Sequence, residues 1–285
     1  MTTTPHPLAN APLGKNSTTP THYNPGLLFP IPRAMARDSL DLSNRLPFMG
    51  HDLWTAYELS WLNPKGKPQV AIGYIAVPCE TPFMIESKSF KLYLNSLNDH
   101  RFDNAVDVAR CIEADINPVL WGEQAPQSRA TVELLSPSEF ERLRLGELDG
   151  LSLDRLDIDM DDTSVEALPR CTDGEGTTVD ETLTSDLVRA LCRVTGQPDW
   201  ASVQIRYVGR PIDQAALLRY LIGFRNKQEF HEPLSERIFV DIWRLCKPLK
   251  LQVLLRFTRR GGLDINPMRT SIPGVTLKTL RSARQ

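Results

Sequence analysis

Long apolar runs and an excess of either charge are both missing from this sequence. No segment approaches the ~20 apolar residues that a membrane-spanning helix needs. The 33 basic residues nearly balance the 35 acidic ones, so the net charge of −2 gives no footprint for a polyanion such as DNA or RNA. Residues 1–32 also lack the charged and then apolar pattern of a secretion signal. We expect a soluble cytoplasmic protein that contacts neither a membrane nor nucleic acid directly.

Motifs for metals, disulfides and nucleotides are missing as well. The five cysteines are odd in number, widely spaced and without a CxxC pair, which argues against a disulfide framework or a zinc site. Neither GxGxxG, GxxxxGK[ST] nor HExxH occurs. We expect reduced thiols, one of which can be reactive, and no metal. A hydride-transferring enzyme with this sequence has to bind its cofactor outside a Rossmann fold.

Prolines and acidic residues divide the chain. Seven prolines fall within residues 1–36, which predicts an arm without regular helix or strand. Apolar residues near Phe29 favour docking of its second half. Residues beyond 160 are acidic and rich in Thr and Gly, which is typical of a linker. The predicted organisation is an N-terminal arm at 1–36, a domain at 37–165, an acidic linker at 166–182 and a second domain at 183–285.

The two domains show the same order of periodic patterns. Val70, Ile72 and Tyr74 alternate as in a strand, and Val203, Ile205 and Tyr207 repeat that pattern. Two runs with helical spacing follow in each half, and each half ends in strand patterns. We predict an α+β fold in which β-β-α-α-β-β occurs twice, with two unrelated α+β domains as the alternative.

The sequence also predicts the structure of two single segments, residues 153–160 and the helix after Phe230. Residues 153–160 are predicted to form a strand. A helix is predicted after Phe230, with Pro233 at its first position, so that Glu232 falls at its cap. Leu245 is expected on the inward face of this helix and Glu236 on its outward face.

Cys192 and Asp199 flank a turn signal, Gly196 to Asp199, that can bring the carboxyl back beside the thiol. A thiolate can add to an electrophilic carbon, and a carboxylic acid can protonate the atom that gains charge. Arg193 can favour the thiolate. The alternative is a buried core thiol beside a turn aspartate, and spacing alone favours that alternative.

Three further segments carry candidate ligand groups. Glu86-Ser87-Lys88-Ser89 lies at a predicted helix start, where N–H groups, hydroxyls and a cation can hold phosphate, while Glu86 accepts N–H donors. A simple serine cap is the alternative. His231 and Glu232 can read the hydrogen-bonding edge of a ligand, or the carboxylate can merely favour the helix dipole. The turn at 259–262, Arg-Arg-Gly-Gly, can bind phosphate or be a basic turn.

Together these motifs resemble one family, the NADPH-dependent 7-cyano-7-deazaguanine reductases in their long, two-domain form. The resemblance runs over nearly the whole chain. It is carried by Leu27-Leu28-Phe29-Pro30-Ile31-Pro32-Arg33, Tyr57-Glu58-Leu59-Ser60-Trp61-Leu62-Asn63, Glu86-Ser87-Lys88-Ser89-Phe90-Lys91, Gln197-Pro198-Asp199-Trp200, Phe230-His231-Glu232 and Arg259-Arg260-Gly261-Gly262-Leu263-Asp264-Ile265-Asn266-Pro267. One departure is Ala190-Leu191 before the cysteine, where the family pattern leads us to expect Ser-Asn.

The resemblance implies two tunnelling-fold domains and the reduction of a nitrile to a primary amine with two NADPH, on the free base and on the pathway to queuosine in tRNA. Cys192 then forms a covalent thioimide and Asp199 supplies the proton. A homodimer is also implied. Because the Glu-Ser-Lys-Ser motif and the cysteine lie in different halves, we expect one site to need both domains, from one chain or two.

The resemblance also implies which residues bind the small molecules. The substrate-binding residues are Ile85, Glu86, Ser87, His231 and Glu232. The residues that hold NADPH are Ser87, Lys88, Arg260 and Gly261.

Overall fold

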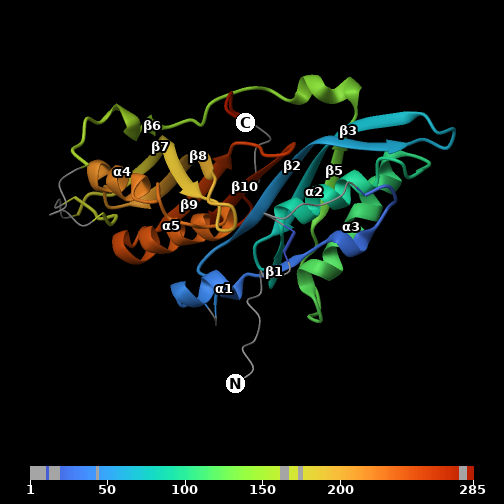
Figure 1. The fold of residues 1–285 in the computed structure, drawn as a ribbon. Helices are drawn as coiled ribbons and strands as arrows, with labels where there is room; N and C mark the ends of the chain where they lie inside the picture. Colours follow the sequence, from blue (N-terminus) through green and yellow to red (C-terminus); the bar gives the residue numbers. More distant parts are fainter. Residues whose placement is uncertain (1–10, 13–19, 43–44, 161–166, 173–175, 276–280) are drawn as a thin grey trace. The chain divides into compact units, whose positions relative to one another are not determined.

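The computed structural model describes residues 11–12, 20–42, 45–160, 167–172, 176–275 and 281–285. The chain forms two compact units. Unit 1 comprises residues 1–43, 53–143 and 259–264, and unit 2 comprises residues 44–52, 144–258 and 265–285. The fold is α+β with a large mixed sheet, as the alternating and helical patterns predicted (Figure 1). The predicted domain boundaries stay a prediction.

In unit 1, which includes most of β2, the strands of the larger sheet lie in the order β5-β3-β2. Strands β1 and β4 pair in a separate two-stranded sheet. Helices α2 and α3 lie along one face of the larger sheet (Figure 1). Its elements are η1 (Pro25–Leu27), β1 (Pro30–Pro32), α1 (Ala34–Arg37), η2 (Asp38–Leu40), β2 (Met49–Leu62), β3 (Pro68–Pro78), β4 (Phe83–Ile85), α2 (Ser87–Ser96), α3 (Ala105–Trp121), β5 (Thr131–Leu135) and η3 (Pro137–Arg142).

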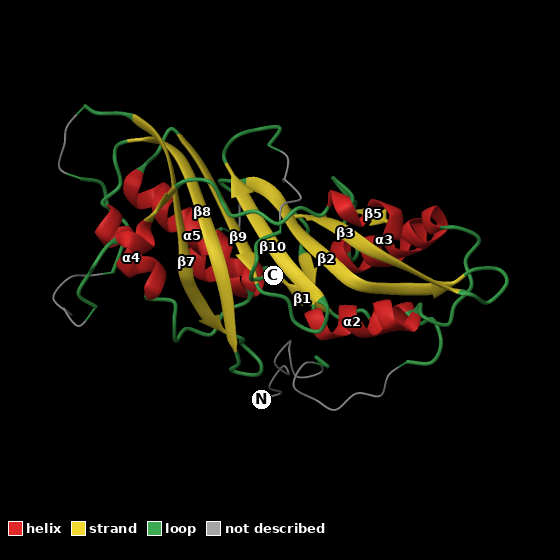
Figure 2. Cartoon of the chain, turned by 90° about the horizontal axis from the view of Figure 1, so that it is seen from above, coloured by secondary structure: helices red, strands yellow, loops and turns green. Residues whose placement is uncertain are grey.

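Unit 2 contains most of β10 and a strand order of β10-β9-β8-β7-β6, antiparallel except for the parallel pair β6–β7. Helices α4 and α5 pack on one face of these strands (Figure 2). Its elements are β6 (Leu151–Ser152), η4 (Leu153–Arg155), β7 (Val179–Leu191), β8 (Pro198–Gly209), α4 (Gln214–Ile222), α5 (His231–Cys246), β9 (Lys250–Phe257) and β10 (Leu263–Thr270).

Apolar residues at strand and helix spacing form the core of each unit, as expected for elements with one buried face. In unit 1, Ile112 and Ile116 of α3 are fully buried, and Asn104 caps that helix by accepting from Asp107 N. In unit 2, Ile205 of β8 and Ile238 of α5 are likewise fully buried. The alternation and helical periodicity read from the sequence therefore hold in both units.

The second half of the arm is docked, as predicted, but it contains a strand that the prolines were expected to exclude. β1 pairs antiparallel with β4, with Pro30 opposite Ile85 and Pro32 opposite Phe83. Phe29 O accepts from Glu86 N and Arg33 N donates to Pro82 O, so the odd-numbered residues face β4. The prolines alternate with them and face away, where a missing N–H costs no ladder bond.

Two other local predictions are wrong. Residues 153–160 do not form a strand, because residues 153–155 are the 3-10 helix η4, where Ser152 accepts from Asp154 N. Helix α5 begins at His231, so Glu232 lies in its first turn and Phe230 is the N-cap. Pro233 is tolerated there because the first N–H groups of a helix have no partner within it.

The faces predicted for α5 need correction at two residues. Glu236 was expected to face water but is buried, because it forms an ion pair with Arg269. Leu245 was expected to face inward but is 48% exposed, because it lies in the last turn before Cys246. Helical period alone does not reveal a long-range ion partner or the edge of the sheet that a helix covers.

Candidate active site

Cys192 and Asp199 lie at the two ends of the turn that joins β7 to β8 in unit 2. Cys192 N donates to Gln197 O over 2.8 Å, and Gly196 N donates to Cys192 O over 2.9 Å. Gly196 closes this turn at φ +68°, a left-handed conformation that glycine adopts without strain. The turn therefore reverses the chain between the two residues, and the proximity of the carboxyl to the thiol stays a prediction.

Cys192 directly follows the last residue of β7, Leu191, and Asp199 is the second residue of β8. Asp199 lies directly opposite Ala190, and Cys192 lies two residues beyond Ala190. Alternating residues share a face, and Cys192 (7% exposed), Asp199 (5%) and Ala190 (1%) are all buried. Residues in such diagonal positions have Cα atoms about 7–8 Å apart. Such a Cα spacing fits two residues that act on one small group, and that role stays a prediction.

The segment before α5 is joined to this hairpin through Leu191. Leu191 N donates to Lys227 O over 2.9 Å, and Glu229 N donates to Leu191 O over 3.0 Å. These two bonds fix the chain just before Phe230 and His231, so the start of α5 is held beside the hairpin. The departure at Leu191 does not disturb this contact, because only backbone atoms make it.

His231 faces Asp199 and is held flat by an aromatic ring. Its Nε2 lies 3.5 Å from Asp199 Oδ2, and its ring stacks on Phe257 with 3.7 Å between centroids. The other ring nitrogen, Nδ1, is buried and has no hydrogen-bond partner among the described residues. Because a buried polar atom without a partner is costly, a ligand group that bonds Nδ1 is favoured here.

Glu232 follows His231 in the first turn of α5 and is 3% exposed. Its carbonyl accepts from Ser235 Oγ over 2.8 Å. A carboxylate is an acceptor-only group, and at a helix start the backbone dipole favours its charge. Unit 2 thus gathers four of the predicted site residues, namely Cys192, Asp199, His231 and Glu232.

Arg193, which was expected to favour the Cys192 thiolate, lies beside the carboxyl group of Glu229. Its Nη1 lies 3.8 Å from Glu229 Oε1, and Arg237 Nη2 lies 3.9 Å from Glu229 Oε2. Burial raises the pKa of Glu229, an effect that Arg237 and Arg193 partly offset. The Arg193 guanidinium therefore balances a half-buried carboxyl, and its proposed effect on the thiol stays a prediction.

In unit 1, Glu86 caps its own helix. Its Oε1 accepts from Lys88 N and its Oε2 from Ser89 N, each over 2.7 Å, so the cap is Glu86 and not a serine. Burial raises the pKa of Glu86, although the two N–H bonds lower it in part. An ionised carboxylate has about four lone-pair sites, and Lys88 N, Ser89 N and the Ser87 hydroxyl use three of them, so about one remains for a ligand.

This cap makes the N-terminus of α2 less suited to bind a phosphate group. The N–H groups of Lys88 and Ser89 already donate to Glu86, and a carboxylate occupies the place where a phosphate was expected. Ser87 Oγ also donates to Glu86 Oε1, over 3.5 Å, and the side chains of Ser87 and Lys88 are both half-buried. Ile85, the last residue of β4, is buried directly before the cap.

The turn of Arg260 and Gly261 offers an open backbone. Gly261 has φ +56°, is exposed, and has no atom within 4 Å of where a Cβ would stand. Gly262 is closed by contrast, because a Cβ there would lie 2.5 Å from Glu58 Cδ. Arg260 N donates to Leu263 O over 2.8 Å, which closes the turn. These residues fit a role in holding a phosphate-bearing cofactor.

Comparison with known proteins shows the family of this chain. Residues 19–125 match the family model described as "Nitrile reductase, 7-cyano-7-deazaguanine-reductase N-term", and residues 198–273 match "QueF-like protein". A relative from Verminephrobacter eiseniae, named NADPH-dependent 7-cyano-7-deazaguanine reductase, is 52% identical over 98% of this chain and 100% of its own length. The chain belongs to the family of NADPH-dependent 7-cyano-7-deazaguanine reductases.

A second reductase, from Acidovorax ebreus, is 53% identical over 96% of this chain and 97% of its own length. These relatives confirm the predicted family, the enzyme class and NADPH as the cofactor. A solved structure, the archaeosine synthase QueF-Like in the apo form, covers 36% of this chain and 100% of that chain at 15% identity and a TM-score of 0.30. So low a TM-score supports no conclusion about this reductase.

Neither a metal site nor a membrane helix is found in the parts of this reductase that the structure describes. No group of three or more His, Cys, Asp and Glu side chains there is placed to hold a metal ion. None of the described helices has both the length and the apolar composition needed to cross a membrane.

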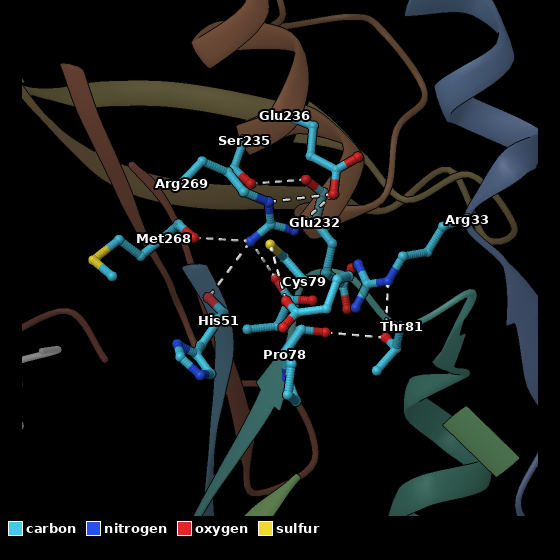
Figure 3. Close-up of polar contacts among 12 residues, drawn as sticks. Arg33, His51, Pro78, Cys79, Thr81, Glu232, Ser235, Glu236, Met268 and Arg269 are labelled. Atoms are coloured by element: carbon cyan, nitrogen blue, oxygen red, sulfur yellow. Dashed lines mark hydrogen bonds and ion pairs between the residues drawn. The ribbon is translucent and has the colours of Figure 1, made fainter. Parts of the chain in front are cut away.

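Sequence patterns missed two sets of arginines in this reductase (Figure 3). In unit 1, Arg33 Nε donates to Thr81 Oγ1 over 3.2 Å and Arg37 Nη2 donates to Cys79 O over 2.6 Å. The docked arm thus fixes residues 79–81, just before β4 and Glu86. Spacing gives no signal for these contacts, because about 45 residues separate each arginine from its partner.

In unit 2, Arg269 of β10 is fully buried between two carboxylates. Its Nη1 lies 2.8 Å from Asp52 Oδ1 and its Nη2 lies 2.9 Å from Glu236 Oε1 (Figure 3). Glu236 lies one helical turn after Glu232, so this ion pair fixes the helix that carries the candidate ligand group. Removing one partner of such a buried pair typically costs about 3–5 kcal/mol.

Proposed function

We propose that this chain performs the reductase activity of its family through a covalent bond between Cys192 and the nitrile carbon of 7-cyano-7-deazaguanine. The product is the primary amine, 7-aminomethyl-7-deazaguanine. The observation that carries this proposal is that Cys192 and Asp199 are both buried and lie on either side of the turn between β7 and β8. A linear nitrile between them presents its carbon to the thiol and its nitrogen to the acid.

The first step adds the thiol across the triple bond. Cys192 Sγ bonds to the nitrile carbon, one C–N π bond breaks, and Asp199 gives a proton to the nitrogen, which yields a thioimide. The proton lost from the thiol restores the acid. Bound NADPH supplies hydride, once to the thioimide and once to the imine that remains after Cys192 Sγ leaves as the thiol. Each hydride is matched by one proton on nitrogen, so the nitrile becomes CH₂–NH₂.

His231 and Glu232 act on the substrate's position. The base presents N–H donors along its edge, and Glu232 is a buried acceptor. The unpartnered His231 Nδ1 offers a further hydrogen-bonding atom, held in place by the ring of Phe257. Such buried groups discriminate strongly against analogues that leave them unpaired.

Ile85, Glu86 and Ser87 of unit 1 are also proposed to bind the substrate. Glu86 is fixed by two N–H bonds to its own helix, so its remaining lone pairs point in set directions. Lys88 and Ser87 near that cap, with Arg260 and the open backbone of Gly261, hold NADPH. These residues contribute charge and hydrogen bonds to the cofactor without taking part in bond changes.

We also propose that the two units are tandem tunnelling-fold domains. The element order supports this, because two long strands precede two helices in each unit, and β5 follows the helices in unit 1 as β9 and β10 do in unit 2. Val70-x-Ile72-x-Tyr74 lies in β3 and Val203-x-Ile205-x-Tyr207 lies in β8, and only the short strand β4 intervenes between β3 and α2. A homodimer in the cytoplasm, acting on the free base in queuosine biosynthesis, completes the proposal.

NADPH consumption tests the reaction. Wild-type protein with the cyano-deazaguanine should lose NADPH absorbance until two NADPH are used per nitrile, and mass spectrometry should find the amine. Cys192→Ala should consume none, while Cys111→Ala, a half-buried thiol on α3, should behave as wild type. No substrate-dependent consumption by wild type would overturn the proposal. Treatment with a metal chelator distinguishes the reductase from a metal-dependent enzyme of the same fold. The activity of the reductase should not change, whereas a metal-dependent enzyme should lose its activity.

A further inference from the structure

Three arginines converge on one indole ring in unit 2. The Cζ atoms of Arg189, Arg225 and Arg284 lie 5.6, 5.4 and 5.9 Å from the centroid of Trp200. Each distance is within the ~6 Å range of cation–π contact. The arginines come from β7, from the segment after α4 and from residues 281–285, so no local pattern in the sequence announces the cluster.

The cluster lies on the opposite face of the hairpin from Cys192 and Asp199. Trp200 is directly opposite Arg189 in the β7–β8 ladder, one residue on from the pair Ala190 and Asp199. Since successive residues of a strand point to opposite faces, Arg189 and Trp200 share the other side. Both are half-buried, whereas Arg225 and Arg284 are exposed and reach the ring from beyond the strands.

The positive charge of this cluster is not balanced within the described part of the chain. None of the three arginines forms an ion pair with a carboxylate of the described residues. Arg284 Nη1 donates to a backbone oxygen, that of Asp186, over 2.8 Å. Arg189 Nε is buried and has no hydrogen-bond partner there. Like charges gathered at one ring repel, and a buried donor without an acceptor is costly, so an anion is favoured at this place.

We propose that Arg189, Arg225 and Arg284 around Trp200 bind a phosphate group. A guanidinium that stacks on an aromatic ring keeps its N–H edge free, and that edge matches the oxygens of a phosphate in pairs. A phosphate dianion carries two negative charges and several acceptor oxygens, which suit three guanidinium groups. The N-terminus of α2 is a poorer place, because Glu86 already occupies its donors.

The phosphate has two possible sources that share this chemistry. One is NADPH, whose ribose phosphate distinguishes it from NADH, and in that case the inference rests on the proposed function. The other is a separate phosphate-bearing molecule. Arg189 precedes Cys192 by only three residues, so either ligand would sit at the same end of the hairpin as the reactive thiol.

Calorimetric titration of the full chain with three probes tests this inference. The probes are inorganic pyrophosphate, adenosine 2′,5′-bisphosphate and NADP⁺, each without the nitrile. Arg225→Gln and Arg284→Gln should each weaken phosphate binding about tenfold or more, because a hydrogen bond to a charged group is typically worth about one tenfold change or more. Arg206→Gln is the matched control, since Arg206 is an exposed arginine on β8 away from Trp200.

The outcomes separate the sources. Weaker binding of both adenosine 2′,5′-bisphosphate and NADP⁺ in the two variants assigns the cluster to the cofactor. Weaker binding of pyrophosphate with unchanged NADP⁺ binding assigns it to a separate phosphate ligand. Unchanged binding of all three probes, or equal loss in Arg206→Gln, would overturn the inference. Nitrile reduction by wild type at saturating NADPH tests the proposed function separately, so the two failures are distinguishable.

Discussion

The two units hold their candidate site residues in opposite ways. In unit 1, both carboxylate oxygens of Glu86 accept backbone N–H bonds from α2. In unit 2, the N-cap of α5 is Phe230, which makes no side-chain cap, and the buried Nδ1 of His231 has no partner in the described residues. Glu86 is thus part of its helix, whereas His231 keeps an atom for a ligand.

This difference indicates which of the candidate site residues also contribute to the stability of the fold. A helix cap contributes to folding whether or not a ligand is bound. A thiol or ring nitrogen that forms no structural bond contributes mainly when the substrate is present. Substitutions in the unit 1 cap should therefore cost stability and binding together, while substitution of Cys192 should cost catalysis with little loss of stability.

The largest effect is expected for Cys192→Ala. Turnover should fall by several orders of magnitude, because no other group can form the thioimide. Thermal unfolding should shift little, since only one sulfur atom is lost from the end of the hairpin. Steady-state NADPH consumption and differential scanning calorimetry measure the two effects. Retained turnover in the purified variant would contradict the assignment of the nucleophile.

Asp199→Asn should follow, with kcat lower by about 10²- to 10⁴-fold, the usual contribution of a general acid. The amide keeps the shape of the side chain, so the substrate should still bind and Cys192 should still be in place. Stopped-flow measurement of the first hydride transfer gives the rate. A variant as fast as wild type would remove Asp199 from the reaction.

Glu86→Ala is the test from unit 1. Two N–H groups lose their acceptor, so the free energy of unfolding should fall by about 1–2 kcal/mol, and KM for the nitrile should rise as well. Denaturant unfolding and initial rates measure both quantities on one preparation. If KM rises while stability stays unchanged, the contrast between the two units is wrong.

The smallest effect concerns Glu229 and pH. Burial raises the pKa of this carboxyl, so the folded state resists its ionisation. Its contribution to stability is fully present below the unfolded value of 4.5 and is lost as pH rises through the folded pKa. Glu229→Gln, which cannot ionise, should therefore be more stable relative to wild type at pH 7 than at pH 4. Melting temperatures at the two pH values provide the check, and a constant difference would argue against it.

Local periodicity predicted much of this fold, because it reports which face of an element is buried. The strand around Tyr74 and the helix after Asn104 follow from residue spacing. The turn predicted at residues 196–199 begins earlier, at Arg193, because Pro198 and Asp199 already belong to β8. The strand β1 was missed because two prolines were taken to exclude a ladder, although they fall on its unpaired side.

Long-range ion contacts could not be predicted in the same way. Glu236 fits the solvent side of a helical wheel, and only its partner Arg269, 33 residues later, makes burial acceptable. The alternative considered for the start of α2 was a serine cap, whereas the structure uses the longer carboxylate of Glu86. The cluster on Trp200 joins residues 95 positions apart, from Arg189 to Arg284.

The covalent bond to Cys192 is the central claim, and intact-mass spectrometry tests it most directly. Wild-type protein incubated with 7-cyano-7-deazaguanine and no NADPH should gain the full mass of the substrate, because addition to the nitrile expels no atoms. Cys192→Ala should gain nothing, and the wild-type adduct should disappear when NADPH is added. An unmodified wild-type mass under conditions where calorimetry shows the nitrile bound would contradict the account.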